Sequence, residues 1–208
     1  MKVEPIEYFY TASSAYAYIG HYQFLRLAEK AGRDVLHRPF GLMKCLNEIG
    51  YHPLEERTKA SLDYQFGRQR DRWSEYRRVT MPKDTPSSHN NGAEIADLIL
   101  IAAKRLELDL EMISAEFMQC HWLNNLDLNN ADAMVEKLKS IDLDADLLIQ
   151  LSKTPEVTAE YEANTTTAIK HSVFGSPTYF VDGDMFFGQD NLCLVRGRFQ
   201  SLLHNWTE

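Results

Sequence analysis

The chain has few cysteines and no long apolar run. Its 208 residues include three widely separated cysteines, Cys45, Cys120 and Cys193. Their spacing matches neither a Cys-x-x-Cys redox pair nor a metal-ligand set, and their odd number argues against a disulfide framework. No segment approaches the roughly 18 apolar residues of a membrane span, and the start has no apolar signal core. The sequence therefore predicts a cytoplasmic protein with reduced thiols and no membrane partner.

Positive charge is also scarce. The chain has 22 Lys and Arg against 30 Asp and Glu, giving a formal net charge of −8. Binding to nucleic acid depends on neutralising phosphates with a basic surface. The basic run at residues 68–78 is interleaved with acids, which is typical of a solvated helix face. We therefore expect no nucleic-acid partner.

The two ends of the chain carry the strand signals. We expect strands at residues 4–10 and 34–39, with a helix at residues 15–31 between them. The apolar stripe of that helix is expected at Tyr18, Tyr22, Leu25 and Ala28. Near the other end, Asp182-Gly183 predicts a hairpin between strands at residues 178–181 and 185–187, followed by a helix over residues 190–204.

The middle of the chain shows amphipathic helical spacing instead. The expected helices are 54–78, 93–106, 110–120, 131–140, 145–151 and 155–171. The order βαβ, helical block, ββα predicts an α/β thioredoxin fold with a large all-helical insertion. We expect residues 1–53 and 172–208 to form the thioredoxin-like domain and residues 54–171 the helical insertion.

The first candidate site is the turn between the first strand and helix. In a thioredoxin fold the redox Cys-x-x-Cys occupies this turn, where the helix N-terminus stabilises a thiolate. This chain has the hydroxyls of Ser13 and Ser14 there and no cysteine. A hydroxyl cannot exchange disulfides, but it can donate a hydrogen bond to a thiolate that a ligand supplies.

The second candidate site is Ser176-Pro177, directly before a predicted strand. This is the place of the cis-proline in a thioredoxin fold, and X-Pro bonds tolerate the cis form. We expect such a bond to leave the backbone N–H and C=O of Ser176 available to an extended, peptide-like ligand.

Together these segments resemble a known family. The pairing of YFYTASSAYAYIG with VFGSPTYFVDGDMFFGQDNL resembles the 2-hydroxychromene-2-carboxylate isomerase family, which is similar to kappa-class glutathione transferases within the DsbA-like thioredoxin superfamily. Arg38-Pro39-Phe40 and the run from Lys59 to Trp73 also resemble family segments. The chain departs from the family pattern at Ala15, where the family has proline, and at Thr11, where it has an acid.

The resemblance implies a glutathione site. Ser14 would be the catalytic residue, donating its hydroxyl to the glutathione sulfur. The residues implied to bind glutathione are Ser176 with Pro177 at the cysteinyl backbone, Asp190 and Asn191 at the γ-glutamyl end, and Lys59 at the glycyl carboxylate. The family implies a homodimer and a glutathione-dependent isomerase or transferase acting on an aromatic or conjugated carbonyl compound.

Other interpretations of these residues stay open. Ser14 is also a suitable N-cap, Asp190 suits any helix start, and Lys59 is compatible with a solvated surface. A non-catalytic binding protein on a thioredoxin scaffold is the alternative function. A DsbA-type oxidoreductase is less compatible with the sequence, because residues 11–17 contain no cysteine.

Overall fold

The computed structural model describes residues 4–51 and 56–200. Within these residues four strands form one sheet in the order β2-β1-β3-β4. They are β1 (Ile6–Tyr10), β2 (Val35–Pro39), β3 (Thr178–Val181) and β4 (Asp184–Phe187). β2 runs parallel to β1, whereas β1 pairs with β3 and β3 with β4 in antiparallel register. This is the predicted thioredoxin sheet, with a βαβ unit first and a hairpin last.

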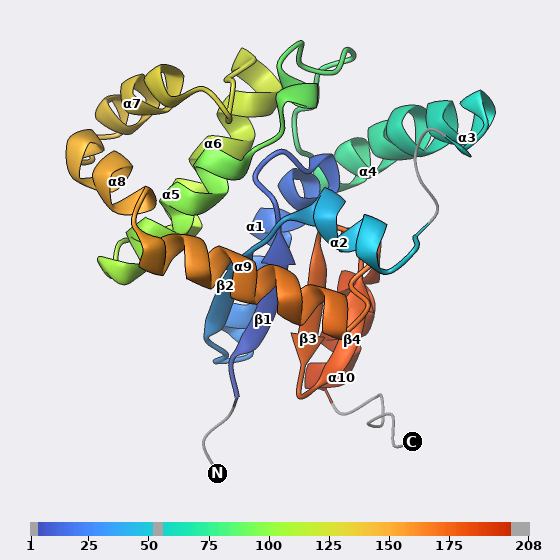
Figure 1. Ribbon diagram of the computed structural model, residues 1–208. Coiled ribbons are helices and arrows are strands. Elements are labelled where there is room, and N and C mark those ends of the chain that lie inside the picture. The colour runs from blue at the N-terminus through green and yellow to red at the C-terminus, as the bar shows by residue number, and fades with distance from the viewer. Residues whose placement is uncertain (1–3, 52–55, 201–208) are drawn as a thin grey trace.

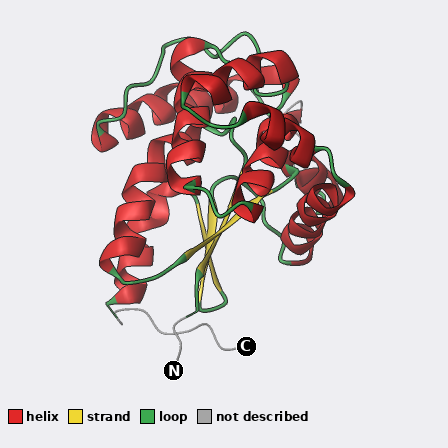
Figure 2. Cartoon of the chain, turned by 90° about the vertical axis from the view of Figure 1, so that its left-hand side faces the viewer, coloured by secondary structure: helices red, strands yellow, loops and turns green. Residues whose placement is uncertain are grey.

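Helices cover both faces of the sheet (Figure 2). The four that lie against it are α1 (Ala15–Lys30), α2 (Leu42–Glu48), α9 (Pro155–Lys170) and α10 (Leu192–Phe199). Residues of α1 and α10 share one apolar cluster with Tyr8 and Tyr10 of β1. Phe9, between those tyrosines, points to the other face and packs with residues of α2 and α9. This alternation is the two-residue period of a strand buried on both faces.

The segment between β2 and β3 is helical apart from its connections. It contains α3 (Lys59–Asp63), the π-helical η2 (Tyr64–Gln69), α4 (Arg70–Arg77), the short η3 (His89–Asn91), α5 (Glu94–Arg105), α6 (Leu110–Asn124), α7 (Ala131–Ser140) and α8 (Ala145–Ser152) before α9. Figure 1 shows these helices beyond one end of the sheet, with α3 and α4 on one side and α7 and α8 on the other. No helix in the two described stretches combines the length and apolarity needed to cross a bilayer.

The helical segment and the sheet share their core. One apolar cluster joins β1 and α1 to buried residues of α5 through α9. The helix expected over residues 54–78 is divided into α3, η2 and α4, and residues 54 and 55 of that range lie outside the described residues. α9, which falls inside the predicted insertion, packs on α2 and β2. The division at residues 53 and 172 stays a prediction.

Helix α1 buries most, but not all, of the apolar stripe expected for it. Ala28 is buried, and Tyr18 and Leu25 pack against the core while partly buried. Tyr22 is 69% exposed, while His21, Phe24 and Gly20 are buried with Ala17 and Ala28. Two tertiary contacts account for the inward position of Gly20 and His21. A Cβ on Gly20 would lie 2.3 Å from Gln189 Cβ, so this glycine faces the turn before α10. On the same side of α1, the Nδ1 atom of His21 lies 3.1 Å from the Tyr8 hydroxyl.

Candidate functional site

The N-terminus of α1 meets the loop before β3. Ser14 caps α1, and its Oγ accepts a hydrogen bond from Ala17 N at 3.1 Å. The same hydroxyl donates to the backbone oxygen of Ser176 at 2.8 Å. Thr11 N in turn donates to Ser176 Oγ at 3.2 Å, and the Ser176–Pro177 bond is cis, as predicted. The fold thus joins the two candidate sites that are separated by more than 160 positions in the sequence.

These contacts modify the expectation for Ser176. Its carbonyl already accepts the Ser14 hydroxyl proton, which leaves one further lone pair for a ligand donor. Its N–H has no acceptor among the described residues. Ser14 and Ser176 are both partly exposed, so a ligand can reach them. A hydroxyl has one proton to donate, and that of Ser14 must turn away from Ser176 O to serve a ligand.

Two glycines allow the close packing around Ser176-Pro177 and β4. A Cβ on Gly175 would lie 2.1 Å from Phe187 Cε2, so only glycine allows the loop to pack this closely on β4. Gly188 has a φ of +88°, a conformation that favours glycine, and its N–H donates to Pro177 O at 2.9 Å. The turn that follows β4 is therefore tied directly to the cis-proline.

Asp190 and Asn191 lie on that turn, in the 3-10 segment η4 (Gln189–Asn191). Asn191 Nδ2 donates to Phe187 O at 2.5 Å, so this amide supports the turn. The Asp190 side chain is exposed. Burial, with a further contribution from the negative charge of Asp190, raises the pKa of Tyr16 to about 12. Asp190 therefore lies within electrostatic range of the Tyr16 hydroxyl, whose backbone belongs to the first turn of α1.

The structure does not bring Lys59 into contact with these residues. Lys59 is the first residue of α3, is exposed, and forms an ion pair with Asp63 at 2.5 Å. Figure 1 shows α3 at the far end of the helical segment formed by α3 and α4, away from the sheet. Its role toward a carboxylate stays a prediction.

Asp97, which the sequence analysis did not single out, lies beneath the Ser14 turn. It is 1% exposed, and its two carboxyl oxygens accept from Thr11 Oγ1 at 2.7 Å and from Ala12 N at 2.9 Å. Burial raises its pKa to about 8, against the opposing effect of these two donors, and the nearby Glu94 raises it further. A signal was present: Asp97 falls in the buried stripe of Ala93, Ala96, Leu100 and Ile101.

Comparison with known proteins identifies relatives over most of the chain. The family of the DSBA-like thioredoxin domain matches residues 5–200. The 2-hydroxychromene-2-carboxylate isomerase of Sphingobium xenophagum is 23% identical over 190 residues, covering 90% of this chain and 93% of that protein. A solved 2-hydroxychromene-2-carboxylate isomerase has a TM-score of 0.77 at 18% identity, with 95% of each chain covered. The cytosolic disulfide reductase DsbM from Pseudomonas aeruginosa, solved with GSH, has a TM-score of 0.66 at 13% identity, covering 95% of this chain and 96% of that one.

Proposed function

The chain belongs to the DSBA-like thioredoxin family, and from that premise we propose that it is a glutathione-dependent isomerase acting on an aromatic or conjugated carbonyl compound. The observation that carries the proposal is the Ser14 hydroxyl, which lies at the N-terminus of α1 and 2.8 Å from Ser176 O, where the fold would otherwise hold a redox cysteine. The names of its isomerase relatives, and the DsbM structure with GSH, support the substrate class and the cofactor.

The residues around Ser14 fit the parts of glutathione. The N–H of Ser176 lacks a protein acceptor among the described residues, and an extended peptide backbone can supply one. The exposed carboxylate of Asp190 suits an ammonium group at the γ-glutamyl end. Lys59 would have to leave Asp63 before it could pair with a glycyl carboxylate.

Glutathione would supply a nucleophilic thiol for reversible addition to a conjugated carbonyl compound. The protein would stabilise the thiolate form in two ways. The Ser14 hydroxyl would turn from Ser176 O toward the sulfur, and the backbone N–H groups and dipole at the start of α1 would favour negative charge there. Both effects lower a thiol pKa, which raises the thiolate fraction near neutral pH.

The turn before α1 has no cysteine for thiol–disulfide exchange, and Cys45 is not suited to it. Residues 11–17 contain no cysteine. Cys45 is fully buried in the second apolar cluster, its thiol donates to Val173 O at 3.2 Å, and burial raises its pKa to about 11. A thiol in this state is a weak nucleophile at neutral pH.

Ser14→Ala, with Ser13→Ala as the matched control, tests the proposal. The thiolate absorbance of bound glutathione is titrated against pH for each protein, and 2-hydroxychromene-2-carboxylate isomerisation is followed with and without glutathione. We expect Ser14→Ala to raise the thiol pKa and to lower kcat by about 100-fold, as loss of one preorganised donor does. Ser13→Ala should resemble wild type.

Each contrary result removes a defined part of the proposal. Wild-type kinetics in Ser14→Ala would reject the role of Ser14, and a loss confined to Ser13→Ala would transfer that role to Ser13. Isomerisation that needs no glutathione would reject the cofactor. Glutathione binding with no change in thiol pKa and no turnover would favour a non-catalytic binding protein.

A further inference from the structure

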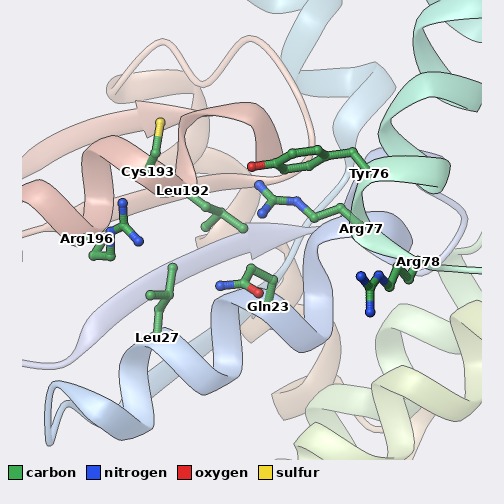
Figure 3. A pocket seen from close by; sticks show the side chains of 8 residues that line it. All are labelled: Gln23, Leu27, Tyr76, Arg77, Arg78, Leu192, Cys193 and Arg196. Atoms are coloured by element: carbon green, nitrogen blue, oxygen red, sulfur yellow. The ribbon is translucent and has the colours of Figure 1, made fainter.

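A second, basic pocket lies beside α1, outside the site that contains Ser14. Its cavity volume is about 320 Å³, it is open to solvent on one side, and it is lined by residues of α1, the end of α4 and the first turns of α10. Figure 3 shows Arg77 reaching from α4 toward α10, and Arg196 on α10 beyond it. Gln23 and Leu27 of α1 and Leu192 of α10 contribute to the lining. Neither Ser14 nor Ser176 lines this cavity.

The charge of this pocket contrasts with the charge of the protein. Three arginines, Arg77, Arg78 and Arg196, line it and no acidic residue does, although the chain has a formal net charge of −8. Within residues 4–51 and 56–200, none of the three forms an ion pair with a carboxylate. Most other arginines of the described residues do form an ion pair with a carboxylate, including Arg33, Arg38, Arg70, Arg105 and Arg198.

Arg77 is held in place by neutral groups. Its Nε donates to Gln189 Oε1 at 3.0 Å and its Nη2 donates to Gln189 O at 2.8 Å. Its guanidinium also lies over the rings of Trp73 and Tyr76, at 5.4 Å and 5.5 Å from their centroids. These contacts fix the orientation of the guanidinium but leave its positive charge without a counter-charge. A fixed and uncompensated guanidinium is suited to bind a carboxylate or a phosphate.

We propose that this pocket binds a small organic dianion, either a dicarboxylate or a phosphate monoester. Its charged groups would bind Arg77 and Arg196, and its carbon atoms would contact Leu27 and Leu192. Arg78, at the C-terminal end of α4, would add positive charge at the rim. Because Gln189 holds Arg77 and directly precedes Asp190, an anion here would bind next to the turn that carries Asp190 without occupying the site of Ser14.

Calorimetric titration of the full chain with succinate and, separately, with glycerol 3-phosphate tests this site. We expect one of the two to bind at millimolar concentration or tighter in physiological salt, which identifies the dianion class. Arg196→Gln should weaken that binding by about tenfold or more, since it removes a charge-assisted contact. The Arg196 side chain has no ion-pair or hydrogen-bond partner among the described residues, so this variant should keep its fold.

Arg26→Gln is the matched control, because it removes the same charge from an exposed arginine of α1 that does not line the pocket. It should leave the affinity within about twofold of wild type, as expected for an exposed charge that solvent and salt screen. The proposal is overturned if neither anion binds, or if Arg26→Gln weakens binding as much as Arg196→Gln. It is also overturned if Ser14→Ala, with Arg196 intact, abolishes anion binding.

Discussion

Replacing Asp97 with asparagine should change how stability depends on pH. Burial raises the pKa of this carboxyl from 3.8 to about 8 in the folded protein. Between these values the folded state holds a proton that the unfolded state has released, so the free energy of unfolding falls as pH rises. The loss is roughly 1.4 kcal/mol for each pH unit, and it stops above the folded pKa. Asparagine resembles the protonated acid in shape and does not titrate.

Asp97→Asn should therefore gain stability relative to wild type as pH rises. The difference in the free energy of unfolding should grow by about 2–3 kcal/mol between pH 5 and pH 7 and become constant above about pH 8. The carboxamide can still accept from Ala12 N, and its amide can donate to Thr11 Oγ1, so the turn before Ser14 should keep its shape.

Urea unfolding followed by tryptophan fluorescence at pH values from 5 to 9 measures this difference. Asp132→Asn is the matched control, because Asp132 is an exposed aspartate in the first turn of α7. Its curve should remain parallel to that of wild type. Parallel curves for wild type and Asp97→Asn would refute the reasoning, since they would show that Asp97 holds no extra proton in the folded state.

Two further predictions concern the packing of α1. Burial lowers the pKa of His21 from 6.5 to about 4. The contribution of His21 to the free energy of unfolding is therefore full above pH 6.5 and is lost as pH falls toward 4, by roughly 1.4 kcal/mol per pH unit. His21→Gln should reduce this dependence on acid pH in urea unfolding, and an unchanged dependence would contradict the assignment. Gly20→Ala places a Cβ 2.3 Å from Gln189 Cβ and should destabilise the fold by about 1–3 kcal/mol in thermal or urea unfolding. Gly67→Ala, where a Cβ would meet nothing within 4 Å, should be neutral or stabilising, and equal losses in the two variants would argue against the close contact at Gly20.

The sequence predicted most helices, but it predicted less well which of their residues are buried. Helix α1 was expected, and Ala28, Tyr18 and Leu25 of its predicted stripe do lie on or against the core. Tyr22 was wrong, and apolar spacing did not indicate that Gly20 and His21 face inward. Periodicity cannot show that Gly20 must approach Gln189, more than 160 residues later in the chain. The same limit applies to Asp97, which lies in an apolar stripe but acts through Thr11, 86 residues away.

The sequence by itself determined the order of the strands and of most helices, though not α2, together with the hairpin at Asp182-Gly183, the cis-proline position and the absence of a redox cysteine at the first turn. These features depend on local backbone preferences and on residue identity, both of which a sequence displays directly. Only the tertiary structure decided that the Ser14 hydroxyl donates to Ser176 O, that Asp97 supports the turn, and that Arg77 is fixed on Gln189. Each of these is a contact between distant segments, and its existence depends on how the sheet and helices pack.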